Sequence, residues 1–345
     1  MQNFSKLLEI SIPTYNRCDY LKICLDSILS NFSHLSINDR SLIKISIYDN
    51  FSSDLTPKLL SEYDKIFNSK KISFNYFINK RNYGADFNIA QSYKKSSGEY
   101  TLVFGDDDLF MPRALHKIIN ILKNNRSIGV FYVNCFSYSL KPSSPPFQLF
   151  KNYQKVSLKK LFLKYTYKLT FISSVIVKNN KRIDSEKYKG SWLVQYGYIT
   201  ELIDSYSNGL IISEYLIQAK RNNTGYQSNS LVLVPSPSFY EVFLDNFLTL
   251  SSKLKFFKKK KKLILKKILL NFVIFNIAFN GLNIDIEKLD YHFINLKLYK
   301  YFIRVILIKF KNYKKLLQFL AIIFRLIDGD FFKIINFYLN NKLIK

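Results

Sequence analysis

Short apolar segments alternate with amphipathic helical segments along residues 7–139 of this chain. In the helical segments apolar residues recur every three or four positions, as Leu21, Cys24 and Ile28 do. Strands are expected at 7–13, 43–49, 72–79, 99–106 and 127–139, and helices at 18–32, 56–68, 84–97 and 111–125. This alternation predicts an α/β fold with a mostly parallel, Rossmann-like sheet and helices on both faces.

Carboxylates gather where two of these strands end. The stretch "GEYTLVFGDDDLFMPRAL" places Asp106, Asp107 and Asp108 directly after an apolar segment, and Asp49 ends another strand. Ligands of open α/β sheets bind outside the carboxyl ends of the strands. Clustered carboxylates there suit a hard divalent cation, which can hold two phosphates of a nucleotide and neutralise a departing diphosphate. The alternative is that they cap the following helix, a task for which one aspartate is enough.

Four segments of the first 120 residues resemble, in order, sequence blocks of the family 2 glycosyltransferases, which have the GT-A fold. The four segments are "LEISIPTYNRCDYLKICLDSIL", "ISIYDNFSSDLTP", "NKRNYGADFNIAQS" and "SSGEYTLVFGDDDLFMPRAL". A later segment, "KLTFISSVIVKNN", resembles the abequosyltransferase-like branch of O-antigen or capsule assembly. The resemblance implies a nucleotide-sugar donor and a divalent metal, Mg or Mn.

The resemblance also assigns donor-binding residues. The positions that match the donor site of the family are Pro13, Thr14, Tyr15, Arg17, Asp49, Asn82, Gly84 and Asn88. Asp49 matches the acidic residue that contacts the nucleotide base. Gly84 lies in the loop that approaches the nucleotide, where a glycine lets backbone come close to a ligand.

The acidic motif departs from the pattern of the family, which is Asp-X-Asp-Asp with a proline four positions after the last aspartate. Counting back from Pro112 places Gly105 at the first aspartate, Asp106 at X, and Asp107 and Asp108 at the last two. The resemblance therefore implies that the metal is held by Asp107, or by Asp108 if the loop is shifted. Asp106 is assigned to the nucleotide.

The catalytic base is a second departure. Inverting members of the family carry a Glu-Asp pair before a Trp-containing helix, whereas this chain has Gly190, Ser191 and Trp192 at that place. Glu201 and Asp204, three residues apart on one helix face, are the candidate bases, or merely part of a solvated face. The choice between inversion and retention stays open. Trp192 is interpreted either as a stacking surface for a sugar or as a packing anchor.

The last third of the chain differs in character. Residues 251–345 contain 21 Lys and Arg residues against 5 Asp and Glu residues, interleaved with long apolar runs. We expect a glycosyltransferase domain at 1–235 and a basic helical region at 236–345. Five lysines, Lys258 to Lys262, favour a helix lying on an anionic membrane surface. The alternatives are an ordinary helical bundle and a nucleic-acid-binding region.

Bulk composition limits the classes of site and location. Three cysteines without a CxxC spacing, and three histidines, argue against a zinc site and for reduced thiols. The N-terminal segment does not resemble a signal peptide, and no long uncharged apolar run predicts a transmembrane helix. We therefore expect a cytoplasmic protein, peripheral on the inner face of a bacterial plasma membrane.

These observations together predict an enzyme that moves a sugar from a nucleotide diphosphate to a hydroxyl of a lipid-linked surface polysaccharide. Two rivals remain. One is a non-catalytic GT-A scaffold in a membrane assembly complex. The other is a nucleic-acid-binding protein, suggested by the formal charge of +27.

Overall fold

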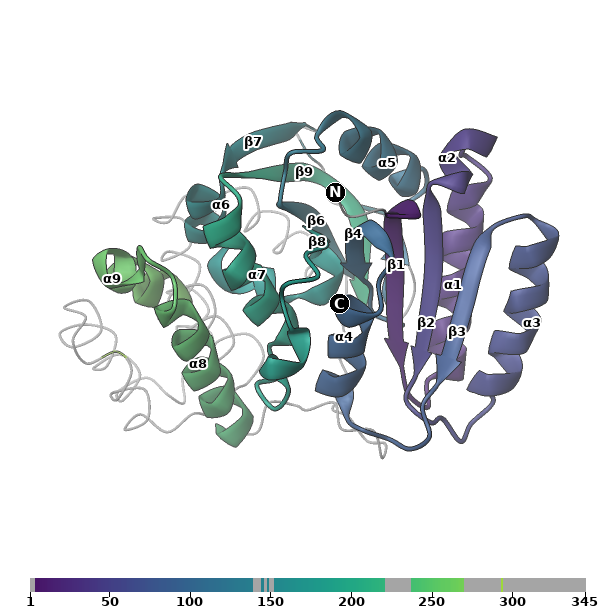
Figure 1. The fold of residues 1–345 in the computed structure, drawn as a ribbon, viewed down its shortest axis with the longest axis horizontal. Coiled ribbons are helices and arrows are strands. Elements are labelled where there is room, and N and C mark those ends of the chain that lie inside the picture. Colours follow the sequence, from purple (N-terminus) through teal and green to yellow (C-terminus); the bar gives the residue numbers. More distant parts are fainter. Residues whose placement is uncertain are drawn as a thin grey trace, which may run out of the picture. The chain divides into compact units, whose positions relative to one another are not determined.

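The structure is a computed structural model that describes residues 4–138, 144–145, 148, 152–220, 237–269 and 293. Its centre is a nine-stranded sheet in which the path of paired strands runs β3-β2-β1-β4-β8-β6-β9-β5, with β7 pairing to β9 (Figure 1). The alternation predicted from the sequence is confirmed as an α/β fold.

The first four strands in chain order form a parallel half. They are β1 (Lys6–Thr14), β2 (Ile43–Asp49), β3 (Ser73–Ile78) and β4 (Gly98–Val103). The helices between them are α1 (Cys18–Phe32), α2 (Ile37–Ser41), α3 (Thr56–Ser69) and α4 (Ala85–Lys94). Because the chain steps from β1 to β3 in one direction and returns to β4, right-handed crossovers put α4 on the opposite face from α1 and α3.

The remaining strands form a mixed half. They are β5 (Leu109–Phe110), β6 (Val130–Tyr138), β7 (Tyr153–Ser157), β8 (Val175–Lys178) and β9 (Asn208–Lys220). The other elements are α5 (Ala114–Asn124), α6 (Leu158–Tyr165), α7 (Val194–Ser205) and three 3-10 turns, η1 (Thr166–Thr170), η2 (Ile172–Ser174) and η3 (Ser185–Tyr188). Strand β8 runs antiparallel to both β4 and β6, whereas β6 pairs with β9 in parallel, so this half of the sheet is mixed.

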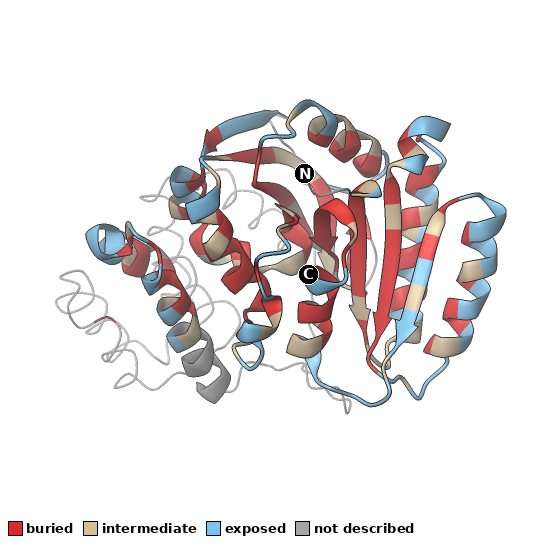
Figure 2. Cartoon of the chain, viewed as in Figure 1, coloured by how far each residue is buried: buried red, intermediate tan, exposed pale blue. Residues whose placement is uncertain are grey.

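The core lies between the sheet and its helices. Helix α1 buries Leu21, Cys24, Leu25, Ile28 and Phe32 along one stripe, as the three-to-four spacing requires. The central strands β1, β2 and β4 are buried on both faces, as expected of a parallel sheet covered by helices (Figure 2). This packing fixes the strand ends, and with them the polar residues that follow.

The chain divides into two compact units, residues 1–232 and 233–345. In the second unit the structure describes α8 (Pro237–Ser252) and α9 (Phe257–Ile268). The rest of the predicted basic helical region lies outside the described residues, apart from residues 253–256, Leu269 and residue 293. Among the helices that the structure describes, none is long and apolar enough to cross a membrane.

Candidate active site

Polar residues follow the carboxyl ends of three parallel strands at one edge of the sheet. Thr14 ends β1, Asp49 ends β2, and Asp106 comes three residues after β4. Phe104 still pairs with β1, because its N–H donates to the Ser11 carbonyl oxygen at 2.9 Å. Strand β2 lies on one side of β1, and β4 lies on the other side. The boundary between β1 and β4 is therefore the topological switch point, where such sheets bind ligands.

Asp106 and Asp107 converge on one arginine. The Arg17 guanidinium lies 3.2 Å from Asp106 Oδ1 and forms a second, closer ion pair with Asp107. Thr14 Oγ1 donates to the other oxygen of Asp106 at 2.7 Å, and both of these side chains are buried. Asp107 is the more accessible of the two aspartates, with its side chain 19% exposed, so it is the one that a ligand can reach.

Asp108 turns away from this pair and holds the mixed half of the sheet. Its carboxylate accepts a hydrogen bond from Ser173 Oγ and another, at 2.9 Å, from the backbone N–H of Lys220 at the end of β9. Ser173 Oγ in turn accepts from the N–H of Gly105 at 2.8 Å. Both oxygens of Asp108 thus accept hydrogen bonds from the protein. Asp108 therefore stabilises the conformation of the turn formed by residues 106–108, called here the acidic turn.

Gly105 is required by this arrangement. A Cβ atom at residue 105 would lie 2.7 Å from Asp108 Oδ2, closer than real side chains approach. An aspartate at residue 105, where the family pattern has its first one, would therefore require the Asp108 carboxylate to move. The departure from the family motif accompanies the inward position of Asp108.

The acidic turn is under electrostatic strain. Burial, with Arg17 opposing it, raises the pKa of Asp106 to about 7. Burial and the neighbouring Asp107 charge raise the pKa of Asp108 to about 8. Placing further positive charge beside these carboxylates would relieve the repulsion between them. The donor set thus favours a cation next to Asp107.

Within the described part of the chain, no three or more His, Cys, Asp and Glu side chains are grouped so that they could hold a metal ion. This does not disqualify magnesium or manganese, because Mg²⁺ is commonly held by one or two carboxylates, with substrate phosphates and water completing its shell. The residues present fit that pattern through Asp107 and Asp106.

Two basic side chains share one aromatic ring beside the acidic turn. The Arg17 guanidinium carbon lies 5.0 Å from the centroid of the Tyr20 ring, and Lys220 Nζ lies 5.4 Å from the same centroid. Because the Lys220 backbone is bound to Asp108, its position is set by the acidic turn. The Lys220 side chain was not singled out from the sequence, since it lies more than 100 residues from the motif.

Asp49 has an unsatisfied oxygen. Its Oδ1 accepts from the N–H of Ser52 at 3.1 Å and from the Ser52 hydroxyl, whereas the buried Oδ2 has no hydrogen-bond partner. Burial raises the pKa of Asp49, and the Ser52 hydrogen bonds oppose that shift. A buried carboxylate oxygen without a donor is costly, so a ligand that donated a hydrogen bond to Asp49 Oδ2 would remove this cost.

Asn50 fastens the loop that contains Asn82 and Gly84. Its Nδ2 donates to Asn82 Oδ1 at 2.6 Å and to the Gly84 carbonyl oxygen at 3.2 Å, and its Oδ1 accepts from the N–H of Tyr83 at 3.1 Å. Gly84 has φ +86°, a backbone conformation that favours glycine. Sequence reasoning missed Asn50, although its place directly after Asp49 at a strand end was a usable signal.

The other predicted donor residues lie at the same strand ends. Asn88 is buried, and its Nδ2 donates to the Tyr48 carbonyl oxygen at 2.7 Å and to the Thr14 carbonyl oxygen at 3.4 Å. It thereby ties the ends of β1 and β2 together from α4. Pro13 and Tyr15 flank Thr14 and are partly exposed.

The candidate bases on α7 do not join the acidic turn through any contact that the structure records. Glu201 forms an ion pair with Lys187 and accepts a hydrogen bond from the Tyr188 hydroxyl. Asp204 is exposed one residue before the end of α7. Glu201 is therefore engaged in holding η3, and its assignment as a base stays a prediction, as does that of Asp204.

Comparison with known proteins indicates the class to which the chain is similar. Residues 9–178, just under half of the chain, match the model of the family described as glycosyl transferase family 2. An uncharacterized glycosyltransferase of Mycoplasma genitalium, MG025, is 30% identical over 132 residues, which are 36% of this chain and 40% of that protein.

A second relative has a more specific name. The abequosyltransferase RfbV of Salmonella typhimurium is 35% identical over 102 residues, which are 30% of this chain and 28% of that protein. The chain thus spans less than half the length of these two curated relatives.

Solved structures confirm the fold. S. aureus TarS, residues 1–349, superposes with a TM-score of 0.57 at 17% sequence identity, covering 82% of this chain and 77% of that one. The same protein in complex with UDP gives a TM-score of 0.55 at 16% identity, covering 79% and 72%. The fold is the GT-A fold of glycosyltransferases, with a curled mixed sheet.

Proposed function

We propose that this chain transfers a sugar from a nucleotide diphosphate donor to a hydroxyl group of an acceptor. The observation that carries the proposal is the convergence of Arg17, Asp106 and Asp107 at the switch point of the sheet, beside the unpaired buried oxygen of Asp49. These features supply both ends of a nucleotide site, an acceptor for a base N–H and a charged cluster for a diphosphate. The TarS structures with UDP and with UDP-GlcNAc support this placement by analogy of fold.

In the proposed complex each donor-site residue has a distinct task. Asp49 accepts a hydrogen bond from the base, while the loop held by Asn50 closes against the nucleoside. Arg17 and Lys220 attract the diphosphate. A divalent Mg or Mn, held by Asp107 with Asp106 beside it, would supply Lewis-acid stabilisation of the departing diphosphate. Asp108 keeps the turn in the conformation that presents Asp107.

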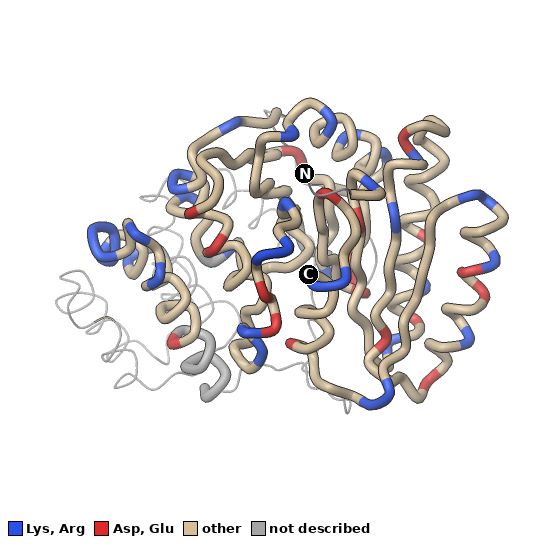
Figure 3. Tube along the Cα trace, in the orientation of Figure 1, with Lys and Arg blue, Asp and Glu red and all other residues tan. Residues whose placement is uncertain are grey.

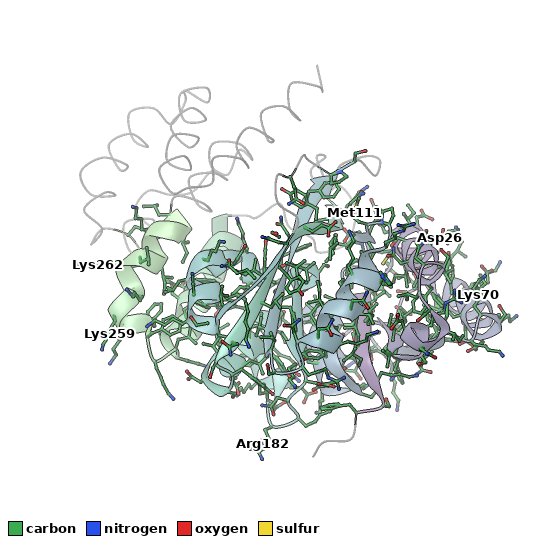
Figure 4. The ribbon with its side chains drawn as sticks, turned by 90° about the horizontal axis from the view of Figure 1, so that it is seen from above. Asp26, Lys70, Met111, Arg182, Lys259 and Lys262 are labelled. Atoms are coloured by element: carbon green, nitrogen blue, oxygen red, sulfur yellow. The ribbon has the colours of Figure 1, made fainter. Side chains whose placement is uncertain are left out.

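The acceptor is proposed to be a lipid-linked glycan of a surface polysaccharide. Support comes from the relative named abequosyltransferase and from the lysines of α9. Lys258 to Lys262 are exposed, whereas the apolar residues Ile264, Leu265 and Ile268 of the same helix are buried. Figure 3 shows the basic residues along α9 in blue. Lys259 and Lys262 point outward from α9 (Figure 4).

This arrangement favours electrostatic adsorption of α9 over insertion of its apolar stripe into lipid. Each lysine near an anionic surface contributes about 1 kcal/mol. We propose that the protein is peripheral on the cytoplasmic face of the membrane. Liposome sedimentation with and without phosphatidylserine tests this, since binding should require the anionic lipid and fall with salt. Equal binding to neutral liposomes would contradict it.

The donor is tested by thermal unfolding of the purified protein with UDP, GDP, CDP and dTDP, each with and without Mn²⁺. A ligand that binds only the folded state raises the midpoint by mass action. We expect one nucleotide to raise the midpoint in a Mn²⁺-dependent manner, and the matching nucleotide sugar then to be consumed. The same screen identifies the donor class.

The rival functions give different results in the same assays. A non-catalytic scaffold would bind the nucleotide but leave the nucleotide sugar intact in the presence of membrane extract. A nucleic-acid-binding protein would show no nucleoside diphosphate preference, and its affinity for RNA or DNA would fall steeply with salt. Either pattern would overturn the proposed transfer.

A further inference from the structure

The segment from η3 to the start of α7 is fastened along helix α4. Ser185 Oγ donates to the Ala90 carbonyl oxygen at 2.7 Å, and Lys94 Nζ pairs with Glu186 at 2.8 Å. The last contact lies at the first turn of α4, where Asp86 Oδ2 accepts a hydrogen bond from the Trp192 N–H at 2.8 Å. Side chains at both ends of this segment therefore bind it to α4.

Asp86 is more than a helix-capping acid. Its carboxylate is aimed at the backbone of a segment more than 100 residues away in the chain. Burial raises the pKa of Asp86, and hydrogen bonds from the backbone of Trp192, Gly190 and Ser191 lower it in opposition. The carboxylate thus faces a tight turn without regular secondary structure of its own and accepts a hydrogen bond from its Trp192 N–H.

Trp192 is held in an unusual conformation by this turn. Its φ is +59°, a backbone conformation that is rare for a bulky residue, and the residue is 41% exposed. Strained backbone of this kind is concentrated at ligand-binding sites. A large aromatic residue that is strained yet not buried is not explained by core packing.

The position of Trp192 relates it to the donor site. Helix α4 begins directly after Gly84, in the loop that Asn50 fastens, so its first turn lies at the carboxyl edge of the parallel strands. Because Asp86 binds the Trp192 N–H to that first turn, the Trp192 backbone lies near the edge of the sheet that carries Asp49 and Asp106.

We propose that Asp86 is a positioning residue that holds Trp192 as an aromatic platform for the sugar ring of the acceptor. This rests on the proposed function and names the acceptor side of the same site. An indole pairs an apolar face with a polar N–H, which suits a sugar ring with its C–H face and its hydroxyl groups. Asp86 acts through the backbone of Trp192 and takes no proton from the acceptor.

Trp192 is the only tryptophan of the chain, so intrinsic emission reports on it directly. We would measure acrylamide quenching of this emission in the wild type, Asp86→Asn, Asp86→Ala and the control Asp26→Ala, which alters an exposed aspartate of α1. Because an asparagine oxygen still accepts the Trp192 N–H, Asp86→Asn and the control should match the wild type. Asp86→Ala should raise the quenching constant about twofold as the turn loosens. Unchanged quenching in Asp86→Ala would overturn the fastening role.

The platform itself is tested by titrating the wild type with methyl glycosides of glucose, galactose, mannose and N-acetylglucosamine, and with uridine. At least one glycoside should change the Trp192 emission saturably, and Asp86→Ala should weaken that binding about tenfold while Asp86→Asn retains it. No response to any glycoside in the wild type, or a response to uridine alone, would overturn the assignment to the acceptor.

Turnover separates this inference from the alternative of a catalytic base and from the proposed function. A base would lose its activity in Asp86→Asn, with kcat falling about 100-fold or more; a positioning residue would retain kcat in this variant. Loss of kcat in Asp86→Asn would therefore contradict the inference. If the protein binds the nucleotide but its emission responds to no glycoside, only this inference is contradicted. If the protein binds no nucleotide, the proposed function is contradicted.

Discussion

The parallel half of the sheet and the mixed half meet at the turn of Asp106 to Asp108, and they hold it by different means. On the parallel side, Arg17 and Thr14 come from the end of β1 and bind Asp106 and Asp107 through side chains. On the mixed side, Ser173 and the backbone of Lys220 bind Asp108.

This difference assigns separate tasks to three adjacent aspartates of identical chemistry. The carboxylates that face the parallel half are paired with the Arg17 guanidinium, which a diphosphate can engage in their place. The carboxylate that faces the mixed half is saturated by short protein hydrogen bonds. We infer that Asp107 serves the ligand and that Asp108 serves the fold.

The largest effect should separate these tasks directly. Asp107→Ala should lower sugar transfer about a thousandfold, as expected for losing charge stabilisation of the leaving diphosphate. The melting temperature should stay close to that of the wild type, because Arg17 keeps its pairing with Asp106. Activity is measured by nucleoside diphosphate release with the donor found in the thermal screen. Retained activity would place the ligand elsewhere in the turn.

Asp108→Ala should act on the opposite property. The Ser173 hydroxyl and the Lys220 N–H would lose their buried acceptor, at a cost of about 2–3 kcal/mol in the free energy of unfolding. Urea denaturation followed by circular dichroism gives this value. If Asp108→Ala were as stable as the wild type but inactive, the division of tasks would be reversed.

The pH dependence of stability sharpens the same comparison. The pKa of Asp108 is raised in the folded protein to about 8, so the folded state binds a proton that the unfolded chain releases. Stability from this group is therefore present at low pH and is lost as pH rises from about 4 to about 8. In metal-free protein the destabilisation caused by Asp108→Asn should be larger at pH 5 than at pH 8. A destabilisation that grows with pH would contradict the raised pKa.

The smallest effect is expected on α7. Glu201→Gln removes a charge that is already paired with Lys187 and bound by Tyr188, so transfer should fall less than about threefold. Side-by-side initial rates with the wild type suffice for the test. A loss of several hundredfold would instead support Glu201 as the base.

The sequence predicted the parallel half well because its signals are local. Apolar stripes three to four residues apart, as in α1, and strands buried on both faces leave a periodic pattern. The strand pattern also placed Asp49 and Asp106 at one edge of the sheet, and the family resemblance added Thr14 and Arg17. The antiparallel direction of β8 could not be predicted, because an apolar segment does not indicate whether it pairs in parallel or antiparallel.

The fasteners of the site were less predictable. Ser173 and Lys220 lie 65 and 112 residues from Asp108, and no local pattern connects them. The contact of Asp86 with Trp192 spans 106 residues. By contrast, Gly105 was visible as a departure from the motif, and only the position of Asp108 explains it. The sequence indicates which residues lie at a strand end, whereas predicting contacts between distant residues requires the topology of the sheet.

The most direct test of the account is calorimetric titration of the metal-dependent nucleotide into the wild type and Asp107→Asn, each with Mn²⁺, with Asp64→Asn on α3 as the matched control. The wild type and the control should bind one nucleotide with the same affinity, and Asp107→Asn should bind it at least about tenfold more weakly. Without Mn²⁺ the difference between the wild type and Asp107→Asn should largely disappear. Equal affinity of all three proteins in Mn²⁺ would contradict the central claim that Asp107 presents the metal to the donor.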